Sequence, residues 1–294
     1  MSTKILPHDD PKLKPYKEAI SDYTEGFRLM GMPYWVFVEG SNPVGVVAVG
    51  KEPYQLLAPV GTPLSVIRVL DYEQQLEALR GFATKALAIS KENGVDYVST
   101  SVPSKYHEVI GQFQELGFMV LSDSYRMVCP LDGPLEPSSV LRFEMVQRDQ
   151  VRRFIELTKG YMNGSPDIVL NMILENLSNI PEQFLDIWYN LEQLYFAHHE
   201  GAVVGILDLN PGEGMINNIG VAPPHRSKGH GRQIMLFGMK TLKQGGLESA
   251  RLRVHVDNER AIHLYETLGF KVTDRRSTLI WEKESSNQAT RANR

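Results

Sequence analysis

The stretch VAPPHRSKGHGRQ, residues 221–233, lies between two apolar runs of the chain. The run before it, MINNIGV, predicts a strand, which must end at the proline pair because proline cannot continue a hydrogen-bonded ladder. The run after it, GRQIMLFGMKTLKQ, has apolar residues at helical spacing. A helix is therefore predicted over residues 227–244, with Gly229 and Gly231 at its start.

A helix start of this composition suits a phosphate group. Backbone N–H groups in a first helical turn have no intrahelical partner, and the helix dipole is positive at this end. Glycine lets an anion approach those N–H groups closely, and Arg226, Lys228 and Arg232 add positive charge. We interpret the stretch as a pyrophosphate cradle; the alternative is a glycine-loosened helix start with solvated cations.

The surroundings of this stretch recur earlier in the chain. Leu-Gly-Phe at residues 268–270 also stands at 116–118, an offset of 152 residues that pairs Gly246 with Gly94 as well. In each copy a strand, a polar turn and an amphipathic helix precede Leu-Gly-Phe. Further upstream, YWVFVEGSNPVGVVAV and YFAHHEGAVVGILDL share a hairpin pattern. Such a long period indicates duplicated domains rather than a solenoid.

We therefore predict a mixed α/β fold built from two tandem copies of one unit. The first copy is placed at residues 1–132 and the second at 140–284, with a turn-rich linker at 133–139 and a disordered tail at 285–294. In the second copy, one strand and two helices precede the hairpin, and two strands close the copy.

Two motifs around the cradle resemble those of a known family. Val221-x-Pro223-x-x-Arg226-x-x-Gly229-x-Gly231 resembles the acyl-CoA-binding motif of the GNAT N-acetyltransferase superfamily. The segment NERAIHLYETLGF, residues 258–270, resembles the second signature of that family. The resemblance implies two tandem GNAT-like acyl-CoA N-acyltransferase domains. It also implies transfer of an acetyl group from acetyl-CoA to an amine, by direct attack in a ternary complex.

The resemblance implies roles for single residues. The backbone of Ile219, Gly220 and Val221 would pair with the pantetheine arm, and an N–H near Val221 would polarise the thioester carbonyl. Asn258 would also contact this arm. Tyr265 would protonate the departing thiolate, since the phenol pKa of about 10 is close to that of a thiol; the alternative is a packing aromatic. The N–H groups that would hold the pyrophosphate belong to Arg226, Ser227, Lys228, Gly229, His230, Gly231 and Arg232.

The sequence assigns no general base. Many members of the family carry a glutamate on the strand that here reads MINNIGV, where this chain has Asn217 and Asn218. Glu213, just before the strand, and Asp208, on the neighbouring strand, keep a water-linked carboxylate open.

The first copy is predicted to lack cofactor binding. With the offset of 152 residues, Phe113 stands in the place of Tyr265 and Tyr106 in that of Asn258. Residues 73–81, EQQLEALRG, occupy the cradle position without Gly-x-Gly and with acidic residues. We expect a degenerate structural domain that shapes the acceptor cleft.

The charge and composition of the chain limit the classes of partner that it can bind. Lys plus Arg number 31 and Asp plus Glu 35, a net charge of −4, which argues against a nucleic-acid binder. Cys129 is the single cysteine, so neither an internal disulfide nor a Cys-based zinc site is expected. The adjacent His198 and His199 point to opposite faces of a strand, so we expect no metal. The sequence has no apolar run of about 18 residues and no apolar N-terminal segment, which predicts a cytoplasmic protein without membrane contact.

The leading interpretation is an acyl-CoA-dependent N-acetyltransferase that takes acetyl-CoA as co-substrate and acts on an amine-bearing small molecule or protein. One alternative is a non-catalytic acyl-CoA binder or sensor. Another is a tandem-domain synthase of an aminosugar thiol, similar to mycothiol synthase, which rests on architecture alone. A homodimer is left open.

Overall fold

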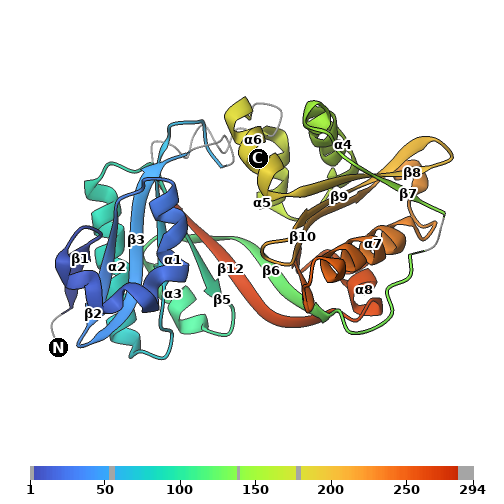
Figure 1. Cartoon of the computed structure of the whole chain (residues 1–294). Helices are drawn as coiled ribbons and strands as arrows, with labels where there is room; N and C mark the ends of the chain where they lie inside the picture. The colour runs from blue at the N-terminus through green and yellow to red at the C-terminus, as the bar shows by residue number, and fades with distance from the viewer. Residues whose placement is uncertain (1–2, 53–56, 138–139, 177–179, 284–294) are drawn as a thin grey trace. The chain divides into compact units, whose positions relative to one another are not determined.

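The chain folds into two compact units (Figure 1). The computed structural model describes residues 3–52, 57–137, 140–176 and 180–283. The first unit combines residues 3–52 and Ala58–Asp123 with the segment that begins at Arg276, and the second unit contains Ser124–Arg275. Each unit is a mixed sheet with helices, which confirms the predicted α/β class.

The first unit has the strand order β1-β2-β3-β4-β5-β12. Strands β4 and β5 are parallel, and the other neighbouring pairs are antiparallel. Helices α2 and α3 cover a core that contains Phe37, Phe82 and Phe113. The elements are β1 (Lys4–Pro7), η1 (Pro11–Tyr16), α1 (Lys17–Leu29), β2 (Tyr34–Glu39), β3 (Asn42–Lys51), β4 (Pro63–Val69), α2 (Leu76–Glu92), β5 (Tyr97–Pro103), α3 (His107–Glu115) and the start of β6 (Met119–Pro130).

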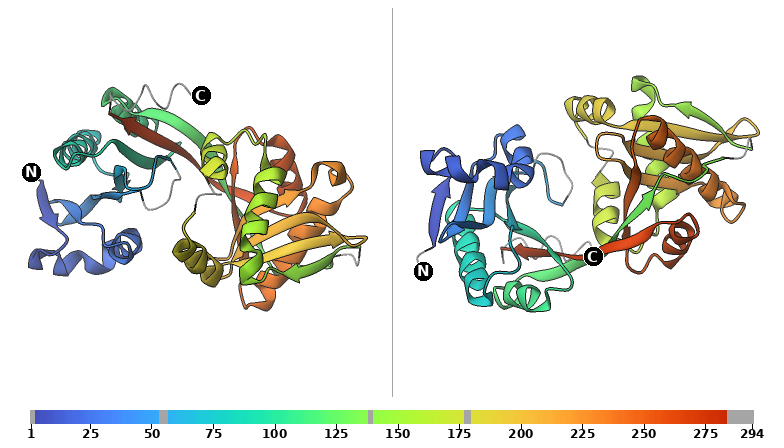
Figure 2. Two further views of the ribbon diagram at one scale, coloured as in Figure 1. Left: turned by 90° about the horizontal axis from the view of Figure 1, so that it is seen from above. Right: turned by 60° about the horizontal axis from the view of Figure 1, so that its bottom comes forward.

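The second unit has the strand order β6-β11-β10-β9-β8-β7. Helices α7 and α8 cover one face of its sheet and α4, α5 and α6 the other (Figures 1 and 2). Helix α6 is absent from the sequence-based prediction. The elements are β7 (Arg142–Met145), η2 (Arg148–Gln150), α4 (Val151–Met162), α5 (Ile168–Asn176), α6 (Glu182–Leu191), β8 (Gln193–His199), β9 (Ala202–Asn210), β10 (Met215–Val221), η4 (Pro223–His225), α7 (His230–Gln244), β11 (Ser249–His255), α8 (Glu259–Thr267) and β12 (Lys271–Glu282).

The element bounds agree with the predicted repeat. Strand β5, helix α3 and strand β6 match β11, α8 and β12 at both ends with the offset of 152 residues. Gly94 and Gly246 follow α2 and α7 with φ angles of 70° and 86°, and Gly117 and Gly269 follow α3 and α8 with φ angles of 92° and 93°. Glycine adopts this left-handed conformation without steric cost, so both copies end their helices in the same way.

The two halves of the chain exchange a strand. The part of β6 from Ser124 onward pairs antiparallel with β11, and the part of β12 from Arg276 onward pairs antiparallel with β5. The units therefore divide within β6 and β12, and not at the predicted boundaries 132, 140 and 284. The prediction of two closing strands is wrong, because between α8 and residue 283, where the described part of the chain ends, β12 is the single strand. The linker at 133–139 lies partly, and the tail at 285–294 wholly, outside the described residues.

Two glycines let a helix lie close to the sheet. Both hairpins, β2–β3 and β8–β9, contain a register shift, and Gly45 and Gly205 lie beside these shifts. A Cβ on Gly45 would lie 2.1 Å from Cζ of Phe82 in α2, and a Cβ on Gly205 would lie 2.4 Å from Cδ1 of Ile234 in α7. Each helix thus buries a large side chain where the strand has none.

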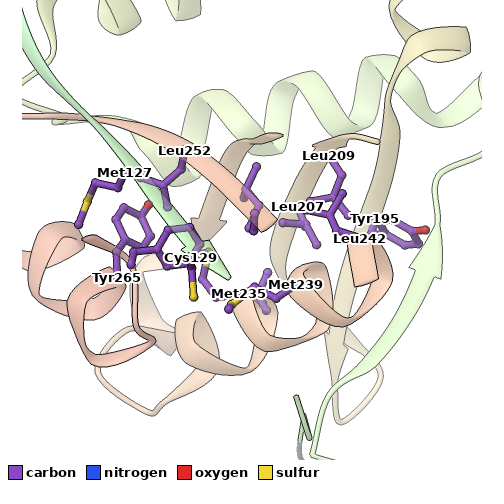
Figure 3. Close-up of a cluster of buried hydrophobic side chains, with 14 of the residues drawn as sticks. Met127, Cys129, Tyr195, Leu207, Leu209, Met235, Met239, Leu242, Leu252 and Tyr265 are labelled. Atoms are coloured by element: carbon purple, nitrogen blue, oxygen red, sulfur yellow. The ribbon is translucent and has the colours of Figure 1, made fainter. Parts of the chain in front are cut away.

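The core between the sheet and helices α7 and α8 of the second unit is formed by aliphatic, sulfur-containing and aromatic side chains (Figure 3). Cys129 and Tyr265 are part of it, and Cys129 is a buried free thiol. Over the described ranges, the helices are too short or too polar to cross a membrane.

Candidate functional site

The second unit contains a cleft of about 800 Å³ that runs along β10. Strands β10 and β11 are parallel, and of the residues of β10, all of which the structure describes, only Met215 and Ile216 pair with β11. On its other side, β10 pairs with β9 as far as Val221. The two parallel strands therefore splay apart and leave the end of β10 open on one side. Ten of the twelve predicted site residues line this cleft; Lys228 and His230 do not.

The open side of β10 offers a backbone donor. Ala222 N donates to Val204 O at 2.9 Å, on the β9 side. Neighbouring residues of an antiparallel strand direct their N–H groups to opposite sides. The N–H of Val221 therefore points away from β9 and toward the cleft.

Helix α7 begins at His230, three residues later than predicted. The reason is the left-handed backbone of Ser227 and Gly229, whose φ angles are 61° and 82°. The first helical hydrogen bond runs from Gln233 N to Gly229 O at 3.2 Å, and in the described part of the chain the N–H groups of residues 230–232 have no acceptor. A Cβ on Gly229 would meet open space. Three free N–H groups at the start of a helix of 15 residues suit a bound anion.

The guanidinium of Arg226 donates hydrogen bonds within the second unit. Its Nε donates to Val221 O at 3.1 Å and its Nη2 to Tyr161 O at 2.9 Å. The side chain therefore ties the loop before α7 to the end of α4.

Two other arginines, Arg232 and Arg260, also line the cleft. Arg232 donates from Nη1 to Thr267 Oγ1 at 3.2 Å, and Arg260 donates from Nη2 to Ser227 Oγ at 3.2 Å. Both bond to neutral hydroxyls, so their charges are not cancelled by these contacts. Arg260 lines the cleft and was missed by the sequence analysis, although it stands two residues after Asn258 in the second motif.

Two predicted residues also have structural tasks. A Cβ on Gly220 would lie 2.8 Å from Cβ of Tyr161, so glycine is required there for α4 to pack on β10. Asn258 caps α8, because its Oδ1 accepts a hydrogen bond from Ala261 N at 3.3 Å. This leaves the Nδ2 donor of Asn258 for the cleft, which it lines.

Tyr265 lies between the core and the cleft. Its side chain packs in the cluster of Figure 3, and the residue is 7% exposed. Burial raises the pKa of the Tyr265 hydroxyl to about 12. The phenol is therefore protonated at neutral pH, as a proton donor must be.

A buried carboxyl group, Asp208, and a half-buried one, Glu192, lie beside β10. Asp208 is 1% exposed, and Asn218 Nδ2 donates to its Oδ2 at 2.7 Å. Glu192 accepts hydrogen bonds from Asn210 Nδ2 and Asn217 Nδ2, both at 3.1 Å. Burial raises the pKa of both carboxyl groups, and contact with Glu192 raises the pKa of Asp208 further. Asp208 is one of the two carboxyl groups that the sequence keeps open as a base, whereas no motif points to Glu192, which is distant in the chain.

The far wall of the cleft combines an ion pair with an apolar helix. Arg253 Nη2 lies 2.5 Å from Asp167 Oδ2, and Asp167 Oδ1 also accepts from Val169 N at 3.0 Å at the start of α5. Apolar side chains of α5 line the same wall: Val169, Leu170 and Ile173. Such a wall can bind the body of an acceptor molecule.

Three histidines gather beneath the loop that precedes α7. The ring centroids of His199, His225 and His230 lie 5.0 to 6.4 Å apart. His230 is 5% exposed, and burial lowers its pKa. Within the residues that the structure describes, no group of His, Cys, Asp or Glu is arranged to hold a metal ion.

Comparison with known sequences supports the motifs. The family model described as "Acetyltransferase (GNAT) family" matches residues 169–270. A mycothiol acetyltransferase of Nocardiopsis dassonvillei is 25% identical over 228 residues, which cover 66% of this chain and 68% of that protein. A mycothiol acetyltransferase of Frankia casuarinae is 30% identical over 171 residues, which cover 53% of this chain and 48% of that protein.

Comparison with solved structures supports the fold of both units. A tandem GNAT protein from the clavulanic acid biosynthesis pathway has a TM-score of 0.62 at 14% identity, covering 96% of this chain and 98% of that one. A GCN5-related N-acetyltransferase from Sphaerobacter thermophilus has a TM-score of 0.59 at 15% identity, covering 85% of this chain and 80% of that one. At these identities the likeness concerns the fold alone.

Proposed function

Because this chain is an acyl-CoA-dependent N-acetyltransferase of the GNAT superfamily, we propose that its second unit carries the reaction and transfers the acetyl group of acetyl-CoA to an amine. The observation that supports this most is the splay of β10 and β11 next to the free N–H groups of α7. One feature accepts an extended chain and the other accepts an anion.

The second unit offers a matching group for each part of acetyl-CoA. The N–H groups of residues 230–232 would bind the pyrophosphate, with Arg232 and Arg260 adding charge. The open backbone of Ile219, Gly220 and Val221 would pair with the pantetheine arm as an added strand does. Asn258 would donate to the same arm from its free Nδ2. When bound, acetyl-CoA supplies a thioester whose carbonyl carbon is open to attack.

Two groups of the chain would act on the reacting atoms. The Val221 N–H would donate to the thioester carbonyl oxygen and stabilise the charge that develops there. Tyr265 would give its hydroxyl proton to the departing sulfur. Because burial raises the pKa of Tyr265 to about 12, the hydroxyl keeps its proton at neutral pH until the departing thiolate takes it.

The first unit, by the same proposal, has a structural role and leaves cofactor binding to the second. Its residues at the cradle position lack Gly-x-Gly, and Phe113 has no hydroxyl in the place of Tyr265. Cytoplasmic location also belongs to the proposal; the buried free thiol of Cys129 is compatible with a reducing compartment.

The acceptor is proposed to be an amine of a small molecule or protein. An aminosugar thiol is the second candidate, and it is favoured by the relatives named mycothiol acetyltransferase. A non-catalytic acyl-CoA sensor is the reading that these proposals oppose.

Calorimetry and a thiol-release assay with an amine panel test the proposal on the full chain. We expect binding of acetyl-CoA and amine-dependent release of free thiol. An Arg260→Ala variant should bind acetyl-CoA more weakly, while Arg80→Ala, a matched cation on the first unit, should bind as the wild type does. Binding without thiol release for any amine would support the sensor, and no heat with acetyl-CoA would refute the site.

A further inference from the structure

Three histidines from separate elements meet next to the proposed pyrophosphate site. His199 ends β8, His225 ends η4 and His230 opens α7. The ring centroid of His230 lies 5.0 Å from that of His199 and 5.9 Å from that of His225. The backbone N–H of His230 has no acceptor among the described residues and is one of the three groups proposed to hold the pyrophosphate. One ring of the cluster therefore belongs to a residue that would contact this anion.

The cluster has no adjacent negative charge that would stabilise a proton on it. Within the described ranges, no carboxylate lies within 4.0 Å of any of the three rings. Burial is the main cause that lowers the pKa of His230. Its titratable and charged neighbours, His199 of β8, His225 of η4 and Lys228 of the loop before α7, lower this pKa further, and a contact with the His225 backbone opposes them.

Two ring nitrogens of the cluster are buried without a partner. Nδ1 of His225 and Nδ1 of His230 have no hydrogen-bond partner within the described residues, and His230 is 5% exposed. A neutral imidazole can leave such a nitrogen as a bare acceptor, whereas the charged ring has an N–H at both nitrogens and would bury an unpaired donor. These features favour the neutral form of the cluster in the protein without its cofactor.

Resting on the proposed function, we propose that the three-histidine cluster supplies a titratable positive charge to the acetyl-CoA site, so that the protein takes up a proton when acetyl-CoA binds. The pyrophosphate is negatively charged, and opposite charges attract more strongly where protein excludes water. A phosphate group at the His230 N–H therefore favours a protonated ring close by. By reciprocity, the affinity for acetyl-CoA rises as the pH falls and decreases again as the pH rises and the cluster loses its proton.

Calorimetry on the full chain measures this linkage. Acetyl-CoA is titrated at about pH 8 and at about pH 6, the range in which histidine changes its charge. Two buffers with different enthalpies of ionisation report the number of protons taken up. The variant combines His199→Gln, His225→Gln and His230→Gln, and the control is His198→Gln, whose ring packs beside Phe196 on the other face of β8. Both variants keep every backbone N–H group of the anion site.

Between these two pH values, the affinity of the wild type should rise roughly three- to tenfold relative to that of the triple variant, the effect of one partly screened charge. The comparison cancels the protonation of the 3′-phosphate of acetyl-CoA, whose second pKa is about 6, because this change is common to both proteins. The wild type should also take up about half a proton more than the triple variant at the lower pH. His198→Gln should behave as the wild type does.

The ring resonances of the wild type provide a second measurement that needs no triple variant. In a pH titration by NMR, the pKa of His230 should rise when acetyl-CoA is bound, and His230→Gln assigns its signals. If the triple variant fails to fold, this titration decides.

Three results would overturn the inference: an unchanged or lowered pKa of His230 on binding, the same pH dependence of affinity in the wild type and the triple variant, or the same loss in His198→Gln. Failure of the proposed function looks different. Acetyl-CoA that binds but releases no thiol would contradict the transfer and leave the proton linkage standing, whereas no heat at either pH would refute the site and the inference together.

Discussion

Strands β4 and β5 of the first unit pair at four positions, from Leu64 to Ile67, whereas the corresponding β10 and β11 of the second unit pair at two. The strands have the same lengths and the same neighbours along the chain. The two further paired positions hold β4 and β5 together in the first unit, whereas β10 and β11 splay apart in the second. The proposed cofactor site thus lies where strand pairing is absent in the second unit and present in the first.

The two units also differ in the side chains at the position of the proposed cofactor site. Leu79 stands in the place of Gly231 and is 2% exposed within the core of the first unit. Tyr72 stacks on Tyr106, the counterpart of Asn258, with ring centroids 4.7 Å apart. The space that a cofactor would need is therefore filled by apolar and aromatic groups.

The charges differ as well. Arg80 and Arg232 occupy equivalent positions, but Arg80 pairs with the carboxylate of Glu115 at 2.6 Å and Arg232 bonds to the hydroxyl of Thr267. A cation with a carboxylate partner attracts an anion less than one with a neutral partner does. The two units share the same fold, but Arg232 in the second unit remains more available to an anion than Arg80 in the first.

The largest effect is expected from the residue that differs at the proton-donor position. Tyr265→Phe should lower kcat roughly 100-fold, the lower end of general acid catalysis, and leave acetyl-CoA affinity unchanged. Since burial raises the pKa of Tyr265 to about 12, the phenol stays protonated and should cause no alkaline fall in kcat up to about pH 10. Steady-state kinetics across pH measure both. Turnover within threefold of the wild type would assign Tyr265 to packing, and Phe113→Tyr, the reverse change, should create no activity.

The next largest effect is expected at the two glycines that let a helix pack closely on the sheet in each unit. Gly45→Ala and Gly205→Ala should each lower the free energy of unfolding by about 1–3 kcal/mol, because the added methyl group overlaps Phe82 or Ile234. Urea denaturation measures the loss, and Phe82→Leu should restore part of it in Gly45→Ala. Gly45→Ala should bind acetyl-CoA normally; weaker binding would contradict the assignment of cofactor binding to the second unit.

A third substitution, Gly231→Ala, should hinder the approach of the cofactor without disturbing the packing of the second unit. In Gly231→Ala the new Cβ would lie 3.5 Å from Leu264 Cδ2, an ordinary contact, so thermal stability should hold. The methyl group should hinder the pyrophosphate and raise the acetyl-CoA Kd roughly tenfold, or about 1.4 kcal/mol. Calorimetry compares it with Gly81→Ala on α2, where nothing lies near the added Cβ and Kd should not change. Equal Kd values for both variants and the wild type would place the pyrophosphate elsewhere.

The smallest effect concerns charge. Thr267→Glu should give Arg232 the carboxylate partner that Arg80 has and raise the acetyl-CoA Kd roughly two- to fivefold, as expected of an exposed ion pair. The difference should shrink in 0.5 M salt, where screening acts within about 4 Å. Calorimetry at two salt concentrations measures it, and a salt-independent change would point to a steric cause.

Local chemistry explains what the sequence predicts well. The Leu-Gly-Phe repeat, the proline stop after β10 and the glycines at the start of α7 each depend on a few neighbouring residues, and the structure has them as expected. Partners that depend on distant chain segments were missed. Strands β6 and β12 occupy equivalent positions after Leu-Gly-Phe, so no local feature of the sequence determines whether each of them pairs with β5 or with β11. The diversion of Arg226 to two carbonyls and the pairing of Asp208 with Glu192 likewise exist only in the folded unit.

The exchanged strands decide how such a protein can be taken apart. A fragment that starts at residue 140 keeps every proposed catalytic group but loses β6, so β11 would present a bare edge of unpaired N–H and C=O groups. Expression of that half alone should therefore yield aggregates rather than a smaller enzyme. For the same reason, a truncation of the first half has to end before Ser124 if the second unit is to keep the strand that pairs with β11.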